Sequence, residues 1–320
     1  MGLMDQGQFD LAFKAVGIVV LIGVVLFLIT WSGIVQCKQV SPYWCQGYDM
    51  IMGGPRVLIV YGETGLGDPQ QLRLYLQDSR YVAAGAVDML AIERVSLGNL
   101  KKYDLVIVEH AKKLSADHLQ MFEDYVVKNG GRLVWVADAG TERYPDELEG
   151  LTDQNTGKVV YNNVWARVKD DPDNPANYIV VSFDEFLGVR YIDNYCNQKE
   201  CADGNFLVGS IESEPTGENP LIFGTSPILN FRINKDRGFS VVKQIANSPN
   251  SNIVLTLNFG GNIKGKTQDL GRIIPIITTS SIGAPGADRV AYYAYPPEWF
   301  YADNGYFTYV KNLYYGMLGR

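Results

Sequence analysis

Two apolar runs separated by an amphipathic stretch define the centre of this chain. Residues 105–108 and 133–137 are continuous apolar runs, which is typical of strands covered on both faces by helices. Between them, Ser115 is a suitable helix N-cap, and Gly130 with Gly131 favours a left-handed C-cap. Apolar residues recur at helical spacing in this stretch, at Leu119, Phe122 and Val126. The pattern predicts a strand–helix–strand crossover with parallel strands and a right-handed connection.

The rest of the chain extends this pattern on both sides. Apolar runs at 56–61 and 87–92 flank a helix beginning at 70–76. Residues 141–252 are rich in Asp, Asn, Gly and Pro, with short β-like runs at 158–161, 178–183, 206–211 and 221–224 and a short helix at 183–188. Core strands follow at 253–257 and 289–295, and a helix at 303–318 closes the chain. We therefore predict an α/β fold over residues 55–320, with a flavodoxin-like, mostly parallel sheet, helices on both faces and an irregular β-rich insertion at 141–252.

The N-terminal region has a different pattern. After a tail of residues 1–14, residues 15–35 contain no charge and are rich in Val, Ile and Leu, which is long enough to cross a bilayer as a helix. A buried core helix would show a polar face, and a signal peptide would have a shorter apolar run; cleavage of a pilin-type leader near Lys14 is a further alternative. An uncleaved single-pass anchor fits best, followed by a linker at 36–54.

Four cysteines all follow this apolar segment. They form two close pairs, Cys37 with Cys45 and Cys196 with Cys201, and no thiol is left over. This arrangement favours disulfides in an oxidising compartment, and so a domain outside the cytoplasm. The alternative is a single zinc site made of four thiolates, although neither spacing is the tight pair typical of structural zinc.

Charge and composition narrow the possible partners. The net charge is −7 and no run of Lys or Arg occurs, which argues against nucleic acid. The chain contains only two His residues, which argues against a metal site built from several His ligands and against a His-dependent catalytic triad. We predict no metal and no cofactor.

A glycine-rich loop follows the first predicted strand. It contains Gly62, Thr64, Gly65 and Gly67 and precedes a helix, so its amides are candidates for binding phosphate. However, the loop also carries acidic residues and lacks the dinucleotide-binding spacing of glycines. A turn that only reverses the strand is the favoured interpretation.

Polar residues follow two neighbouring predicted strands. Glu109 and His110 end one strand, while Asp138 and Thr141 follow the next. Because open parallel sheets present ligands at the carboxyl ends of their strands, these four residues form a candidate ligand rim. Strands also end in polar residues simply because they reach solvent, so an acid–base site here is the less favoured reading.

The order of these segments resembles the class I glutamine amidotransferase-like superfamily. The resemblance rests on residues 56–62, 103–110, 130–136 and 286–298. Within the superfamily it is closest to the non-catalytic branch found in gliding-motility, intraflagellar-transport and oligosaccharyltransferase subunits. Catalytic members carry a Cys on the elbow after the strand that corresponds to 133–137, with a later His and Glu. Here the elbow holds Asp138, Ala139 and Gly140, and no His follows residue 118. The resemblance therefore does not imply amidotransferase activity.

Together these features predict a membrane-anchored, catalytically silent binding or scaffolding subunit of a cell-envelope complex. Its partners would be the lipid bilayer and other membrane or envelope proteins. The aromatic segment around Trp299 is a candidate contact surface, because Trp is enriched at binding hot spots. The alternative function is a membrane-tethered enzyme or a binder of a small ligand, such as flavin or a nucleotide, at the strand rim.

Overall fold

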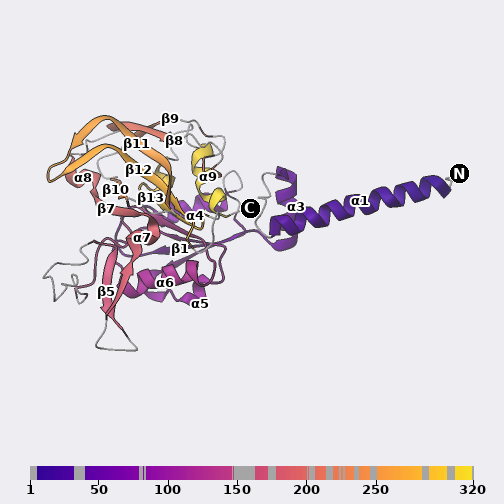
Figure 1. The fold of residues 1–320 in the computed structure, drawn as a ribbon, viewed down its shortest axis with the longest axis horizontal. Coiled ribbons are helices and arrows are strands. Elements are labelled where there is room, and N and C mark those ends of the chain that lie inside the picture. Colours follow the sequence, from indigo (N-terminus) through magenta and orange to yellow (C-terminus); the bar gives the residue numbers. More distant parts are fainter. Residues whose placement is uncertain are drawn as a thin grey trace. The chain divides into compact units, whose positions relative to one another are not determined.

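A computed structural model describes most of the chain and divides it into two compact units (Figure 1). One unit is Met1–Gly54 with the last two residues, and the other is Pro55–Leu318. The described residues are 6–31, 40–78, 82, 84–145, 147, 163–171, 178–199, 201, 206–213, 219–222, 225, 228–233, 238–245, 251–282, 288–300 and 307–318. Each unit is considered separately below.

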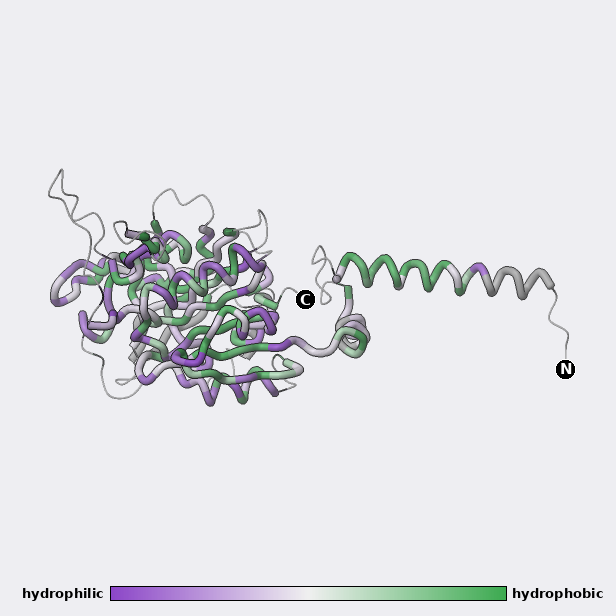
Figure 2. The backbone as a smooth tube through the Cα atoms, turned by 90° about the horizontal axis from the view of Figure 1, so that it is seen from below, coloured by the Kyte–Doolittle hydropathy of each residue, from purple (hydrophilic) through white to green (hydrophobic). Residues whose placement is uncertain are grey.

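The first unit contains the long apolar helix that the sequence predicts. Helix α1 spans Gln6–Trp31, and its segment Lys14–Trp31 has a mean hydropathy of 2.5 with only 6% of the segment buried. Figure 2 shows this segment as a continuous hydrophobic tube. The helix is long and apolar enough to cross a membrane. The last four residues of the predicted span, 32–35, lie outside the described residues.

The predicted linker contains a second helix, α3 (Pro42–Met52). Ser41 caps its N-terminus by accepting a hydrogen bond from the Trp44 amide, and Pro42 occupies the first turn, where its missing N–H costs nothing. Gly53, with φ of 80°, ends the helix. This helix was not predicted, because Pro, Gly and aromatic residues are typical of a linker. The only helix signal, the Ser41–Pro42 cap, is short.

The second unit is built on one nine-stranded sheet, which confirms the predicted α/β fold class. The strand order is β2-β1-β3-β4-β13-β12-β11-β8-β9. The first five strands are parallel: β1 (Arg56–Tyr61), β2 (Ala86–Ala91), β3 (Leu105–Val108), β4 (Leu133–Val136) and β13 (Val290–Tyr293). Every side chain of β3, β4 and β13 is buried, as expected for strands covered on both faces.

Helices pack on both faces of the parallel strands. In Figure 1, α5 (Leu97–Leu100) and α6 (Ala116–Val127) lie on one side of the sheet, and α4 (Pro69–Gln77) and α9 (Phe307–Met317) lie on the other. Alternation along the strands explains this, since Trp135 contacts Phe122 of α6, whereas Tyr293 of the next strand contacts Tyr314 of α9. The predicted crossover around α6 is therefore present, capped by Ser115 as expected.

The remaining four strands of the main sheet are antiparallel. They are β12 (Asp269–Ser280), β11 (Ser251–Lys264), β8 (Phe206–Ser213) and β9 (Ile228–Ile233). Two smaller antiparallel pairs join β7 (Val189–Asn194) to β10 (Ser240–Gln244) and β5 (Ala166–Asp170) to β6 (Tyr178–Ser182). Two short helices accompany them, α7 (Phe183–Leu187) and α8 (Tyr195–Gln198).

Several elements differ from the sequence-based prediction. Strands β5, β7, β9 and β10 were not predicted, and the predicted strand at 158–161 lies outside the described residues. Residues 221–222 form a turn instead of a strand. Strand β12 was not predicted at all, because Pro275 interrupts its apolar pattern and its last residues are Thr and Ser. Pro275 lies opposite Thr256, where the register of β11 shifts. A bulge at this point accommodates a residue that has no amide hydrogen to donate.

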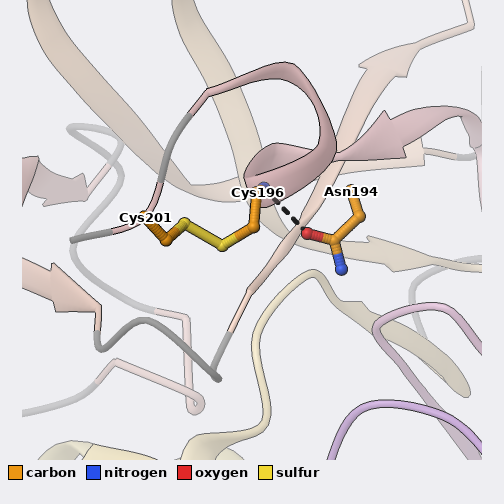
Figure 3. The surroundings of a disulfide bond; sticks show 3 residues. All are labelled: Asn194, Cys196 and Cys201. Carbon is orange, nitrogen blue, oxygen red and sulfur yellow. Dashed lines mark hydrogen bonds between the residues drawn. A yellow bond between two sulfur atoms is a disulfide. The ribbon is translucent and has the colours of Figure 1, made fainter. Parts of the chain in front are cut away.

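One predicted disulfide is present. Cys196 of α8 and Cys201 are bonded, with their sulfur atoms 1.96 Å apart, and the Cys196 amide donates to Asn194 Oδ1 (Figure 3). This bond removes both thiolates from the zinc site considered above. Cys37 and the side chain of Cys45 lie outside the described residues, so the second pairing stays a prediction.

Candidate functional site

Two turns with left-handed backbone lie at the carboxyl ends of adjacent parallel strands. His110, after β3, has φ of 54°, and Ala137, after β4, has φ of 51°. They are the non-glycine residues with positive φ among those described. Such backbone costs energy for residues other than glycine and is concentrated at functional sites. The predicted rim is therefore the candidate functional site.

The turn after β4 is closed and fully buried. Ala137 has no exposed surface, and its carbonyl accepts a hydrogen bond from the Tyr292 hydroxyl at 3.1 Å. The indole nitrogens of Trp135 and Trp165 both donate to the Ala139 carbonyl, at 2.9 and 2.8 Å. The residue with the strained backbone thus has only a methyl side chain, and that side chain is buried.

Asp138 holds the glycine loop. Its side chain is buried, and Oδ1 accepts a hydrogen bond from the Leu66 amide at 2.7 Å. Burial raises the pKa of Asp138, while the Leu66 amide and the Lys112 ammonium oppose the rise. Thr141 donates from its hydroxyl to the Asp138 carbonyl at 2.8 Å. These two predicted rim residues are therefore brought together, and their polar groups serve the local turn and the loop.

The glycine loop lies directly on the backbone that follows β3. The Gly62 amide donates to the His110 carbonyl at 3.0 Å, and the Lys112 amide donates to the Thr64 carbonyl at 2.8 Å. A Cβ atom at Gly65 would lie 2.9 Å from His110 Cα, so only glycine permits this approach. Several loop amides and carbonyls are thus bonded within the protein, as expected for a loop that reverses the chain.

Beneath the same loop lies a pair of buried carboxyl groups, Glu109 and Glu298. Neither has exposed surface, and Glu298 belongs to the short 3-10 helix Pro297–Phe300. Glu298 Oε1 accepts a hydrogen bond from the Asp68 amide at 3.0 Å. Both oxygens of Glu109, and Oε2 of Glu298, have no partner among the described residues.

The surroundings of this pair favour protonation of its carboxyl groups. Burial is the main cause that raises the pKa of Glu109 well above its ordinary value, and the adjacent Glu298 charge raises it further. Burial likewise raises the pKa of Glu298 to about 8. Two adjacent buried carboxylates do not both ionise, so at neutral pH at least one of the two carboxyl groups is protonated. The buried Tyr314 hydroxyl also lacks a partner among the described residues, and burial, together with the nearby acidic pair, raises its pKa.

The two His residues have different surroundings. His110 is half-buried, and its Nδ1 atom is buried without a partner among the described residues. His118 has a structural role, because its Nδ1 completes the capping box of α6 with Ser115. Burial lowers the pKa of His118, which favours the neutral ring. His110 is thus the one of the two whose Nδ1 atom is buried without a hydrogen-bond partner among the described residues.

A cavity of about 480 Å³ lies beside the N-terminus of α6. None of the predicted rim or loop residues lines it. The Ala116 amide of this helix end donates to the Glu147 carboxylate, which is paired in turn with buried Arg167 at 3.0 Å. The helix terminus therefore already holds an anionic group from the chain itself.

Sequence analysis missed two important residues. Glu298 was part of the segment that carries the family resemblance but was given no role, and nothing in the sequence indicates that it meets Glu109. Arg167 lies in the predicted insertion, where its surroundings look irregular. Trp299, the predicted partner contact, is half-buried and packs edge-on against Tyr295 with ring centroids 5.3 Å apart. Its role in binding stays a prediction.

Comparison with known proteins supports the fold. A ThuA-like protein from Bacteroides uniformis has a TM-score of 0.51 and 14% identity, over 83% of this chain and 92% of that one. A GMP synthase component from Thermoplasma acidophilum has a TM-score of 0.42 and 10% identity, over 83% and 93%. An IFT52 N-terminal domain has a TM-score of 0.45 and 12% identity, over 82% and 97%. No protein-family model matches the sequence, and no curated protein is significantly similar to it. The likeness to the ThuA-like protein shows that this chain shares the fold of that protein over most of its length.

Proposed function

We propose that this protein is a membrane-anchored, catalytically silent binding or scaffolding subunit of a cell-envelope complex, related to the non-catalytic branch of the amidotransferase-like superfamily. In this proposal α1 crosses the membrane, the Pro55–Leu318 unit lies outside the cytoplasm, and other membrane or envelope proteins are the partners. The observation that carries the proposal is the strained turn after β4. Its strained residue is Ala137, one position before the predicted elbow at Asp138–Gly140, and it has only a buried methyl side chain.

Nucleophilic catalysis requires a reactive side chain that substrate can reach, with a base within hydrogen-bond distance. At this turn the neighbours of Ala137 are Asp138, whose Oδ1 accepts from the Leu66 amide, and buried Ala139. The turn is held by hydrogen bonds from the Tyr292 hydroxyl to the Ala137 carbonyl and from the Trp135 and Trp165 indoles to the Ala139 carbonyl. The turn has a strained backbone but no nucleophilic side chain, which supports a structural role for the fold.

The location rests on two further observations. The Lys14–Trp31 segment is long and apolar enough to cross a bilayer. The Cys196–Cys201 disulfide suits an oxidising compartment. Both are consistent with a domain that works at the outer surface of a membrane.

The second candidate function is a small-ligand binder at the strand rim. One observation favours it, namely that the Nδ1 atom of His110, at a strained turn, has no hydrogen-bond partner in the part of the chain that the structure describes. A ligand acceptor or donor at that nitrogen would satisfy a buried polar atom. The closed glycine loop and the acidic groups beneath it disfavour a phosphate-bearing ligand.

A thiol placed at the elbow tests the catalytically silent site. Ala137→Cys should resist alkylation in the folded protein, since position 137 has no exposed surface. Val127→Cys, on the 43% exposed position of α6, should react quickly, and the unsubstituted protein measures the background of the native cysteines. Circular dichroism of each variant verifies folding. Rapid alkylation of a folded Ala137→Cys protein would show an open elbow and would contradict this part of the proposal.

A purification experiment separates the two candidate functions. The full chain is extracted from its native membranes in mild detergent, after an alkaline wash that releases peripheral proteins. A scaffold should be retained through the wash and then migrate with a reproducible set of membrane polypeptides. A chain that purifies alone, and that releases a flavin or nucleotide when denatured, would instead support ligand binding. The His110→Ala variant should then lose that ligand.

A further inference from the structure

Helix α3 packs against the end of α1 through its aromatic residues. The Trp44 indole donates to the Thr30 hydroxyl at 3.1 Å, and the rings of Phe27 and Tyr48 lie 5.4 Å apart. Tyr48 is only 6% exposed as a result. Because an α-helix rises about 1.5 Å per residue, Thr30 lies about 24 Å along α1 from Lys14. The contact thus places α3 at the far end of the apolar segment, where an anchored chain would leave the hydrocarbon region.

The apolar surface of α3 continues beyond this contact. Tyr43, Met50 and Ile51 are 83%, 86% and 72% exposed. With Gly47 they occupy positions i, i+4, i+7 and i+8, which form one stripe of a helix next to the stripe that contains Trp44 and Tyr48. Exposed large apolar side chains grouped on one helix indicate a surface that contacts something apolar.

We propose that α3 is an interfacial helix whose exposed stripe, Tyr43, Met50 and Ile51, inserts into the lipid bilayer beside α1. This inference rests on the proposed membrane anchor. A bilayer is the occupant that the geometry favours, because α3 is fixed to the end of a membrane-length helix and Tyr and Trp prefer the boundary between apolar and polar zones. The helix contains no Lys or Arg. Its binding should therefore depend on apolar burial and not on anionic headgroups.

The test is site-specific photocrosslinking in the full chain. A benzophenone amino acid replaces one residue at a time in protein reconstituted into phosphatidylcholine vesicles that contain an alkyne-tagged acyl chain. The three positions are Val20 of α1, Met50 of α3, and Ile228 of β9, which are 58%, 86% and 61% exposed. Ile228 is the matched control, an exposed apolar residue in the other unit.

Lipid capture at Val20 and Met50, with none at Ile228, is the expected result. Replacing phosphatidylcholine with phosphatidylglycerol should leave the yield at Met50 unchanged. Capture at Val20 alone would overturn the interfacial assignment while the anchor stands. Crosslinking of Met50 to a polypeptide, or equal lipid capture at all three positions, would also overturn it. Absence of capture at both Val20 and Met50 would instead refute the anchor.

Discussion

The parallel and antiparallel halves of the main sheet differ in how completely their strands are covered. All side chains of β3 and β4 are buried, whereas β11 and β12 each contain a buried segment and a segment that reaches solvent. The glycines show the same contrast. A Cβ atom at Gly67, beside the parallel half, would lie 2.4 Å from Glu109 Cγ, but one at Gly260 in β11 would meet nothing within 4 Å. The most tightly packed part of the sheet is therefore the carboxyl edge of the parallel strands. Polar groups are enclosed there and must find hydrogen-bond partners within the protein.

Arg167 connects that edge to the rest of the domain, and its removal should have the largest effect. It lies in β5, is 2% exposed, and donates to the carbonyls of Leu114, Gly140 and Glu142 as well as to Glu147. Arg167→Met leaves these acceptors and the Glu147 charge without their partner. We expect a loss of about 3–5 kcal/mol in the free energy of unfolding, measured by urea denaturation.

Arg190→Met is the matched control for this variant. Arg190 is 59% exposed, and its Nε lies 3.7 Å from Asp184. The Arg190 end of this long contact is exposed to solvent, and buried Asp184 keeps a hydrogen bond from the Asn163 side chain at 2.8 Å. Loss of Arg190 should therefore cost only about 0–1 kcal/mol. Equal losses from the two variants would show that Arg167 does not hold the two regions together.

The contrast between the glycines can be tested directly. Gly67 has φ of 110° and Gly260 has φ of 74°, so an alanine is strained at both positions, by about 1–2 kcal/mol. At Gly67 the new Cβ also collides with Glu109, which is fully buried and has no room to move. Overpacking adds about 1–3 kcal/mol. Gly67→Ala should therefore destabilise the protein more than Gly260→Ala, and similar urea midpoints for the two variants would contradict the close packing of the loop.

The same contrast explains what the sequence could predict. Continuous apolar runs identify strands that are buried on both faces, so β1, β3, β4 and β13 were predicted with the Ser115-capped helix between two of them. Strand β12 has only one apolar segment and contains Pro275, so neither periodicity nor length identifies it. Its partner β11 was predicted only at 253–257, where its apolar residues are concentrated.

The candidate site was predictable only in part. Strand ends placed Glu109, His110, Asp138 and Thr141 on one edge, because parallel strands end at the same edge of a sheet. For residues that reach this edge from distant segments, the neighbouring sequence does not indicate the contact. Glu298 reaches Asp68 across 230 residues, and Arg167 reaches Leu114 across 53. Sequence patterns describe one segment at a time, so such long-range contacts require the folded structure.

The buried carboxyl pair should make the stability of the parallel edge depend on pH. In the folded protein the pKa of Glu298 is raised to about 8, and that of Glu109 is raised as well, whereas both are near the ordinary glutamate value when the chain is unfolded. Between these values the folded state holds a proton that the unfolded state has lost. Stability is therefore greatest at the acidic end of this range, and it falls as pH rises from about 4.5 to about 8.

Each retained proton corresponds to a slope of about 1.4 kcal/mol per pH unit. Removing both carboxyl charges in the Glu109→Gln, Glu298→Gln double variant should flatten that part of the profile, as measured by urea denaturation between pH 5 and 8. Glu185→Gln, at an exposed position, controls for the removal of one surface carboxyl. If the stability of the double variant falls with pH as steeply as that of the unchanged protein, the folded state does not retain a proton on this pair. The pH dependence would then have to come from groups outside the enclosed edge, and the difference between the two halves of the sheet would be one of packing alone.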